Sequence, residues 1–405
     1  MSGASIALKD RLRYAVSAHA TAVRPPPHPS AAAPPPIAQI LRGDWHETAH
    51  GPVFVRDEWF PLDHHHGAFP LGCALDATAA SLACLLNGGA APAPARLAFF
   101  DIETTGLSSG TGTYMVLAGL GSYETAAPGE PAAFRMRQYF LADLAHERAM
   151  LAMLADDLAR FDGLVTYNGR AFDMPFVQSR LTLSRLRYPC DGLPHFDLLH
   201  IVRRLYKHRM PGCKLAEAER RLLRIDRPDD VPGSLIPSIY FDYLRAGRVS
   251  PLRAVFRHNA EDVLSLVGVL AQTAALFSRV DLDPEDAVAV ARWWELVGEP
   301  GRAAALYRSS LRWLEGGEDW GWAAMRLARL CRRSGEREEA AALWQYLWAQ
   351  CDRASGVELA KHLEHHARDL GAAAEVTRAL LVRAEDAQRI RLVHRLARLE
   401  RKLQR

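Results

Sequence analysis

A short apolar run that ends in two acids constrains the fold more than any other part of this sequence. Residues 97–102 are apolar and β-prone, and the Thr-Thr-Gly of residues 104–106 closes the run with turn-forming residues. Alternate residues of a strand point the same way, so Asp101 and Glu103 share one face while Ile102 faces the other. Two partly buried carboxylates repel each other, and a bound divalent metal ion would compensate their charge. A solvated strand end, whose acids meet water and stray arginines, is an equal alternative.

Strand and helix patterns alternate around this run, over residues 96–280. Apolar, β-prone segments at 113–124 and 134–141 predict an antiparallel meander of three strands. A helix with an apolar stripe is predicted over 146–161 and a fourth strand over 163–168, followed by mainly helical patterns. The order βββαβα predicts an α/β fold in which a mixed sheet is flanked by helices.

The chain of 405 residues is long enough for two or three domains. We expect a flexible, Pro/Ala-rich region over 1–50, which includes the low-complexity stretch "RPPPHPSAAAPPP" at 24–36. We expect residues 51–95 to be an N-terminal extension that packs on the α/β domain of residues 96–280.

Residues 284–405 are helical in pattern and contain an internal repeat. "WELVGEPGRAAALY" and "LCRRSGEREEAAALW" align Gly298 with Gly335, a period of 37, and Gly371 follows 36 residues later. A glycine in the turn with small residues at the helix crossings is typical of helix–turn–helix repeats. The sequence therefore predicts an all-α, tetratricopeptide-like helical repeat domain.

Cysteine use and hydropathy indicate the compartment. The six cysteines form no C-x-x-C pair, which favours reduced thiols over a disulfide framework or a zinc site. Basic residues interrupt the apolar stretches near the N-terminus, and no run of about eighteen apolar residues predicts a membrane span. We therefore expect a cytoplasmic protein without a membrane partner.

Three consecutive histidines lie at 64–66 within the aromatic stretch "GPVFVRDEWFPLDHHHG". Consecutive side chains of a regular element cannot converge on one ion. A structural or surface role is therefore favoured over metal binding.

Two further acidic motifs follow the first. "TYNGRAFDMPF" begins at the end of the strand over 163–168 and contains Asp173, and "FRHNAEDVLSLVGVL" begins a long helix that carries His258 and Asp262. The last two residues are four apart, so they lie on one face of that helix. The candidate site is therefore Asp101, Glu103, Asp173 and Asp262, with His258 beside them.

These motifs, in this order, resemble the DEDD exonucleases of the ribonuclease H-like fold. The chain is more similar still to the YprB-like group of ribonuclease H-like proteins, on "FFDIETTGL", "YFLAD", "HFDLLH", "DDVPGSLIP" and "FRHNAEDVLSL". The resemblance implies a metal-dependent 3′–5′ exonuclease that hydrolyses single-stranded nucleic acid with two metal ions. A nucleic-acid-binding or protein-binding scaffold on a nuclease-derived fold, or a structure-specific endonuclease, are the alternatives.

The resemblance also implies roles for the acids. Asp101 would bridge two Mg²⁺ ions, for which Mn²⁺ could substitute; Glu103 and Asp262 would complete one site, and Asp173 would hold the second ion. His258 would be the general base, although it lies four residues before Asp262, the register of the tyrosine-type enzymes. A histidine that only starts the helix is its alternative role.

Candidate nucleic-acid contacts lie beside these motifs. A basic run on the helical segment after residue 197 could bind phosphates or could be only a solvated face, and Asp197 itself is predicted to be a helix cap or to support the site from outside it. Asn168 could contact the strand or only cap its turn. The candidate contacts are Thr105, Asn168, Phe172, Arg203, Arg204 and Lys207.

Two segments extend the binding hypothesis. The glycine-containing stretch 106–114 is predicted to form a loop or tight hairpin where the end of a nucleic acid could approach the backbone. The basic, apolar-striped C-terminal segment 389–405 is predicted to cap the repeats, with nucleic-acid guidance as the alternative. The helical repeats could also bind a protein partner.

Overall fold

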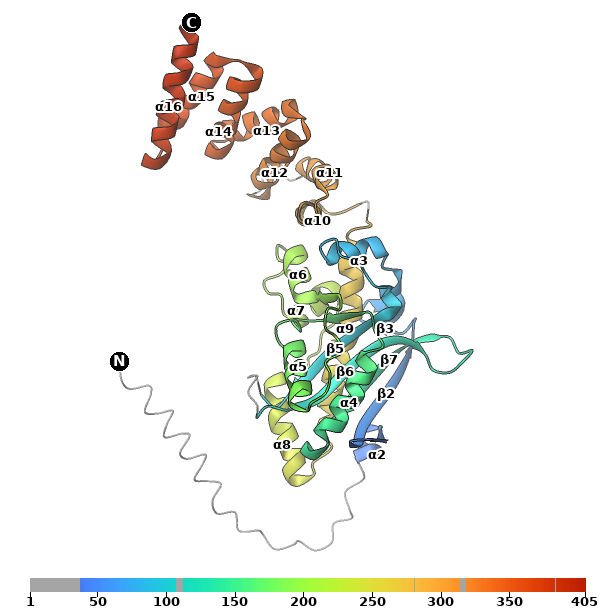
Figure 1. Cartoon of the computed structure of the whole chain (residues 1–405). Helices are drawn as coiled ribbons and strands as arrows, with labels where there is room; N and C mark the ends of the chain where they lie inside the picture. Colours follow the sequence, from blue (N-terminus) through green and yellow to red (C-terminus); the bar gives the residue numbers. More distant parts are fainter. Residues whose placement is uncertain (1–36, 107–111, 280, 314–317, 383) are drawn as a thin grey trace, which may run out of the picture.

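The computed structural model describes residues 37–106, 112–279, 281–313, 318–382 and 384–405. In them an α/β region is followed by a series of helices (Figure 1). The low-complexity stretch 24–36 and residues 107–111 of the glycine-containing loop lie outside the described residues.

A mixed sheet forms the centre of the α/β region. The described residues give it seven strands in the order β1-β2-β7-β6-β5-β8-β9. The predicted meander is confirmed, because β6 pairs antiparallel with both β5 and β7, whereas β8 pairs parallel with β5 and β9. The strands are β1 (Asp44–Thr48), β2 (Gly51–Pro61), β5 (Leu97–Thr104), β6 (Met115–Thr125), β7 (Ala132–Phe140), β8 (Gly163–Thr166) and β9 (His195–Asp197).

The first two strands come from a segment in which the sequence predicts none. β2 runs antiparallel to β7, from Phe54 opposite Phe140 to Pro61 opposite Ala133. β1 pairs with the outer side of β2. Strand β2 of the N-terminal extension thus continues the central sheet, and the extension also carries a small two-stranded sheet of β3 (His65–His66) and β4 (Phe69–Pro70). β1 lies before the extension, within residues 1–50, so the last part of the region expected to be flexible is a paired strand instead.

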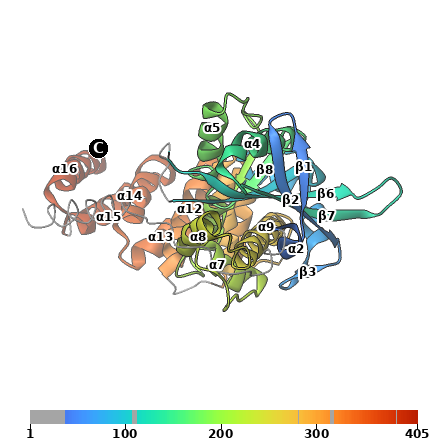
Figure 2. The ribbon, with the colours of Figure 1, turned by 90° about the horizontal axis from the view of Figure 1, so that it is seen from below.

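Helices cover both faces of the sheet (Figure 2). On one face lie α4 (Glu147–Leu158) and α5 (Asp173–Leu183), and the stripe predicted for the first of them is buried at Met150, Leu151, Leu154 and Leu158. On the other face lies the long helix α9 (Leu252–Ala275). The shorter helices of this region are α2 (Ile37–Leu41), α3 (Ala79–Leu85), α6 (Leu198–Tyr206), α7 (Leu215–Ala218) and α8 (Ile236–Ala246).

Alternation along β5 decides where its acids point. Phe100 and Ile102 pack with the residues of α4, whereas Phe99 packs in a second apolar cluster with Val263 of α9. Asp101 has the parity of Phe99, so it faces α9 at the end of the strand.

The C-terminal region is helical, as predicted. Gly298 and Gly335 stand in turns between helices with φ of 84° and 92°, a conformation that favours glycine. Gly371 does not repeat this role, because it lies inside α15, and Arg368 takes the left-handed position with φ of 56°. The helices are α10 (Pro284–Leu296), α11 (Pro300–Leu311), α12 (Glu318–Ser334), α13 (Arg337–Ala349), α14 (Arg353–His362), α15 (Leu370–Val382) and α16 (Asp386–Leu403).

The helical region joins the α/β region through α10. The Trp293 indole N–H donates to the carbonyl of Cys84 at the end of α3 (2.7 Å), inside an apolar cluster that continues from α9 into α10 and beyond. Arg209 pairs with Asp283 (2.7 Å) and Asp286 (3.0 Å). Among the described residues, no helix has the length and apolar character needed to cross a membrane.

Candidate functional site

Asp101 is held at the end of β5 by an amide from α9. The Asn259 Nδ2 group donates to Asp101 Oδ2 (3.0 Å) and to the Asp101 carbonyl (3.3 Å). Gln138 Nε2 in turn donates to Asn259 Oδ1 (3.0 Å), which orients the amide. Gly119 lies opposite Asp101 in the sheet, and a Cβ there would overlap the Asn259 side chain, so the glycine makes room for this contact.

Asp173 enters the site as the first residue of α5. The loop before it turns at Asn168, which has a left-handed φ of 66°, and its backbone is held by Asp197 through N–H groups of Asn168 (2.8 Å) and Arg170 (3.1 Å). A Cβ on Gly169 would lie 2.8 Å from Asp173 Oδ2, so the backbone approaches this carboxylate closely. Asp197 also caps α6 through Leu199 N, which confirms its predicted capping role.

The third part of the site lies on α9. One turn of helix separates His258 from Asp262, and His258 Nε2 lies 3.8 Å from Asp262 Oδ2 and 3.5 Å from Glu103 Oε1. Three elements, β5, α5 and α9, therefore bring the four predicted acids and the histidine to one place.

The carboxylates of this cluster have too little positive charge near them to balance their own charge. Burial, followed by repulsion from Asp262, Glu103 and Asp173, raises the pKa of Asp101 well above its usual range. Burial and repulsion from Asp262 act in the same way on the pKa of Glu103. Burial and the nearby Asp197 raise the pKa of Asp173 to about 7. Within the described part of the chain, no lysine or arginine lies within 4.0 Å of these three carboxylates.

Arg227 is the cation that the sequence analysis missed. Its guanidinium donates to Asp262 Oδ1 (2.6 Å) and to Glu219 (2.6 and 3.1 Å). Glu219 also accepts from Ser265 (2.6 Å), whose hydroxyl lies 2.8 Å from His66 Nε2. Arg227 therefore fixes Asp262 through Oδ1, whereas Oδ2 is the oxygen that lies near His258, and Arg227 is itself fixed by the buried Glu219.

His66 is structural in this arrangement, in agreement with the role favoured for the three histidines. Burial, and then the charge of Arg227, lower the pKa of His66 to about 4. The His66 imidazole contacts the Ser265 hydroxyl, and this contact involves neither His64 nor His65.

Asp230 is a second residue that the sequence analysis did not select, although it lies in the quoted motif "DDVPGSLIP". Both of its carboxylate oxygens lie within hydrogen-bond distance of His258 Nδ1, at 2.9 and 2.8 Å. A carboxylate can only accept here, so the hydrogen-bond network assigns a proton to Nδ1. Nε2 is then directed toward Glu103 and Asp262.

The predicted nucleic-acid contacts are only partly brought to the acids. Phe172 stands directly before Asp173 with 61% of its surface exposed. The Thr105 hydroxyl accepts from Tyr114 N (2.9 Å), so it also closes the turn between β5 and β6. Arg203, Arg204 and Lys207 line a hollow between α6 and helices α10 and α12, away from the strand end.

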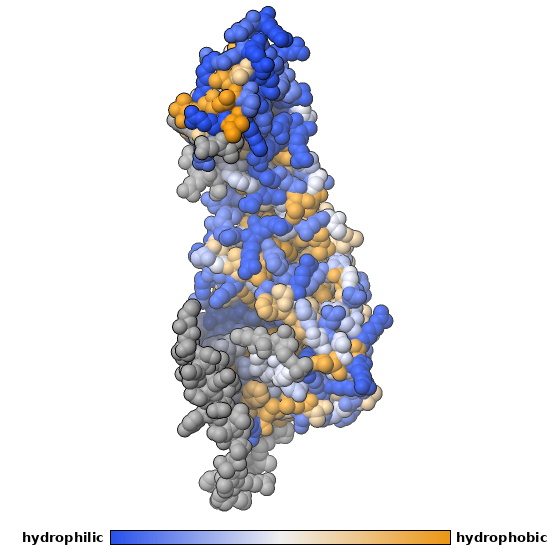
Figure 3. Space-filling view, turned by 60° about the vertical axis from the view of Figure 1, so that its left-hand side comes forward, coloured by the Kyte–Doolittle hydropathy of each residue, from blue (hydrophilic) through white to orange (hydrophobic). Residues whose placement is uncertain are grey.

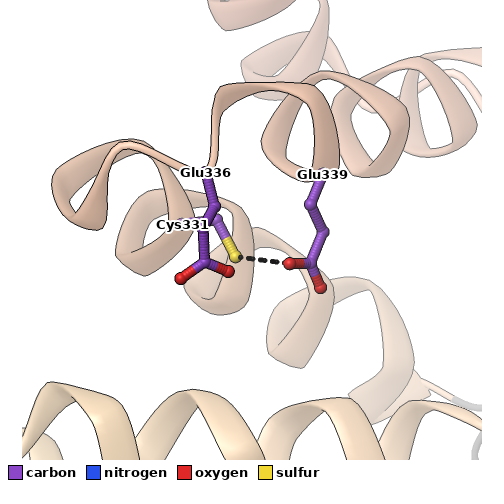
Figure 4. A group of neighbouring side chains, drawn as sticks. All are labelled: Cys331, Glu336 and Glu339. Carbon is purple, nitrogen blue, oxygen red and sulfur yellow. Dashed lines mark hydrogen bonds between the residues drawn. The ribbon is translucent and has the colours of Figure 1, made fainter.

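A second cluster of ligand-type side chains lies in the helical region (Figure 4). Cys331, Glu336 and Glu339 have ligand atoms all within 4.8 Å of one another, a spacing that no other group in the described part of the chain meets. Arg308 occupies it: its guanidinium hydrogen-bonds Glu336 and both oxygens of Glu339 (2.8 Å each). The cation that such a cluster calls for is already a side chain of the protein.

This chain resembles a protein family over the α/β region and a known protein over most of its length. Residues 98–273 match the RNase_H superfamily. A protein of Bacillus subtilis (strain 168), described as "Uncharacterized protein YprB", is 32% identical over 371 residues, which cover 86% of this chain and 86% of that one. The chain belongs to the RNase H superfamily.

The RNase H match contains the whole strand-end cluster, which consists of Asp101, Glu103, Asp173, His258 and Asp262. The match begins on β5, three residues before Asp101, and ends on α9 after Asp262. The likeness to YprB is longer and extends into the helical region. The chain thus has an RNase H-like nuclease domain followed by helices, and nucleases of this superfamily commonly use divalent metal ions.

Proposed function

We propose that the chain is a DEDD-type, metal-dependent 3′–5′ exonuclease that hydrolyses phosphodiester bonds of single-stranded nucleic acid. One observation carries the proposal: four carboxylates from β5, α5 and α9 converge, and only Asp262 has a guanidinium partner. Buried acids that repel one another are costly unless a cation binds among them.

The donor set fits two hard divalent cations. All four side chains offer oxygen, which Mg²⁺ prefers and Mn²⁺ accepts. Asp101 would be shared between the ions, Glu103 and Asp262 would complete one site, and Asp173 would hold the second. Bound there, the ions supply the positive charge that stabilises the attacking and leaving oxygens of an in-line hydrolysis.

His258 supplies the proton acceptor. Because Asp230 holds Nδ1, the lone pair of Nε2 is turned toward Glu103 and Asp262, where a water molecule would be activated. Asp230 acts only by positioning the ring. Phe172, exposed beside Asp173, offers an aromatic face for the terminal base, and Thr105 and Asn168 remain proposed contacts at the rim of the site.

A substrate panel tests the function. Single-stranded oligonucleotides labelled at the 5′ end, labelled at the 3′ end, or closed into a circle are incubated with Mg²⁺, as DNA and as RNA. A 3′–5′ exonuclease shortens the 5′-labelled strand stepwise, releases the 3′ label as a mononucleotide, and leaves the circle intact. Cutting of the circle would identify an endonuclease, and an intact panel would identify a scaffold.

A further inference from the structure

A basic hollow is lined by residues from the end of α6 and from α10 and α12. Figure 1 shows α6 at the end of the α/β part that faces α10. The hollow has a volume of about 720 Å³. One carboxylate, Glu285, lines it together with Trp322 and six basic side chains: His200, Arg203, Arg204, Lys207, His208 and Arg292.

The arginines and the lysine of this hollow make no ion pair among the described residues, although Glu285 also lines it. Within the described part of the chain, no carboxylate lies within 4.0 Å of Arg203, Arg204, Lys207 or Arg292. Neighbouring Arg209, by contrast, pairs with Asp283 and Asp286. Four like charges gathered without partners repel one another, so a polyanion bound among them would be stabilised.

Two of these arginines are held by indole rings instead of carboxylates. The Arg204 guanidinium lies 4.9 Å from the centre of the Trp293 ring, and that of Arg292 lies 4.7 Å from the Trp322 ring. Stacking of this kind orients a guanidinium while leaving its N–H edge free to donate. Such an edge suits the paired oxygens of a phosphate.

Helix α6 connects the hollow to the part of the chain that carries Asp173. His200, Arg203, Arg204 and Lys207 are spaced to share one face of α6. Asp197, at the start of that helix, is the residue that holds the loop before Asp173. A helix of nine residues spans about 13 Å, which places the hollow within reach of a strand whose end lies at the carboxylates.

We propose that this hollow binds the phosphodiester backbone of the uncut part of the substrate, so that the helical region forms half of the single-strand-binding surface. The inference rests on the proposed function, because the strand is the one whose 3′ end the acids would hold. The RNase H-like part alone would then lack Arg292 and Trp322, and with them one wall of the path.

Binding without cleavage tests the proposal. The full chain is titrated in EDTA against 5′-fluorescein-labelled 20-mers of oligothymidylate and oligouridylate, and anisotropy is followed over a range of salt concentrations. On the preferred 20-mer, Arg292→Gln and Lys207→Gln should each weaken binding and each flatten the slope of log K against log[salt] by about 0.7, the value for one phosphate contact on a single strand. Both side chains are exposed, so their replacement should not unfold the chain.

Arg302→Gln is the matched control. Arg302 is also exposed and stacked on an indole, 4.6 Å from the Trp294 ring, but it does not line the hollow. Its variant should bind with the affinity and salt slope of the unchanged chain. Equal slopes for Arg292→Gln and Arg302→Gln would overturn the proposal.

The remaining outcomes separate this inference from the proposed function. If the unchanged chain cleaves with Mg²⁺ while the hollow variants bind the 20-mer normally, the exonuclease proposal is supported and the proposal that the hollow binds the strand is wrong. If the unchanged chain does not cleave any substrate, and its binding of the 20-mer depends on Arg292 and Lys207, the exonuclease proposal is wrong and the proposed binding surface is supported. Displacement of the 20-mer by polyglutamate at equal charge concentration would assign the hollow to an acidic protein instead.

Discussion

The strand-end cluster and the Cys331 cluster are both groups of acids, but they are balanced in opposite ways. At Cys331 the ligand atoms lie close together, and Arg308 donates to both glutamates. At Asp101 the acids are partly buried, Asn259 holds Asp101 and Arg227 holds Asp262, and the three acids other than Asp262 have no lysine or arginine partner among the described residues. Close spacing alone therefore does not identify a metal site; missing positive charge does.

The directions of the pKa shifts make the same distinction. Hydrogen bonds from Arg308 lower the pKa of Glu339 to about 2, because the cation is in place. Burial and repulsion raise the pKa values of Asp101, Glu103 and Asp173 instead. We expect the two clusters to respond oppositely to mutation.

The largest difference should follow from removing one acid of each cluster. Asp101→Ala or Glu103→Ala should abolish Mg²⁺-dependent cleavage and leave the chain folded, with a melting temperature equal to or above that of the unchanged protein, because repulsion is relieved. Glu339→Gln should leave cleavage unchanged and lower the unfolding free energy by about 0–1 kcal/mol, the range for a half-exposed ion pair. Turnover measured with Mg²⁺ and thermal melting measured separately in EDTA test both effects.

Either of two results would break the comparison. Normal turnover in Asp101→Ala or Glu103→Ala would remove the metal-site assignment. Loss of cleavage in Glu339→Gln at unchanged stability would mean that the helical cluster has a part in the chemistry.

The next effect is expected at His258. His258→Ala should lower the rate by about 10²–10⁴-fold, the usual contribution of a positioned general base, with metal affinity nearly unchanged. Asp230→Asn should lower the rate less and should shift the pH–rate profile, because the ring keeps its place but loses the carboxylate that holds the Nδ1 proton. A His258→Ala rate within a few-fold of the unchanged enzyme would show that the four-residue register excludes this histidine from the reaction.

Most residues of the candidate site could be selected from the sequence because they belong to local patterns. Asp101 and Glu103 end an apolar strand, and His258 and Asp262 lie on one face of an amphipathic helix. The meander and the first helix of the sheet were predictable for the same reason: their apolar residues recur at the period of the element.

The missed features depend on contacts between distant parts of the chain. Arg227 and Asp230 lie in a segment without periodicity, 35 and 28 residues before the α9 residues that they contact, and their side chains reach the site. β2 became visible only through its pairing with β7, some eighty residues away. Arg203, Arg204 and Lys207 lie between Asp173 and His258 in sequence, yet the end of α6 turns them toward α10 and α12.

A smaller effect, on stability, should depend on pH. The carboxyl of Asp173 has an ordinary pKa of 3.8 when unfolded and one of about 7 in the fold, so the folded state binds more protons in between. Its contribution to stability is therefore largest below about pH 4, declines as the pH rises, and becomes constant above about pH 7. In EDTA, the melting temperature of Asp173→Asn minus that of the unchanged chain should grow from pH 5 to pH 8; a constant difference would contradict the raised pKa.

The smallest effect is expected at the C-terminal helix, the other basic surface of the molecule. Its cations differ from those of the hollow, because Arg395, Arg398 and Lys402 all donate to the buried carboxylate of Glu364, at 3.0, 2.6 and 3.1 Å. Leu392 and Leu399 of the same helix are buried, whereas Ile390, Val393 and Leu403 are exposed. Figure 3 shows apolar surface among hydrophilic residues at one end of the molecule. The contacts of this helix favour the capping role over nucleic-acid guidance.

Replacement of the basic residues that do not contact Glu364 tests that role directly. A variant with glutamine at four positions, 389, 391, 401 and 405, should bind the labelled 20-mer with an unchanged slope of log K against log[salt]. Glu364→Gln should lower the melting temperature, since three cations lose the carboxylate that holds α16 against the helical turn Leu363–Ala367, between α14 and α15. A slope flattened by about 0.7 for each lost contact, at unchanged stability, would instead make the C-terminal helix a phosphate-binding surface like the hollow.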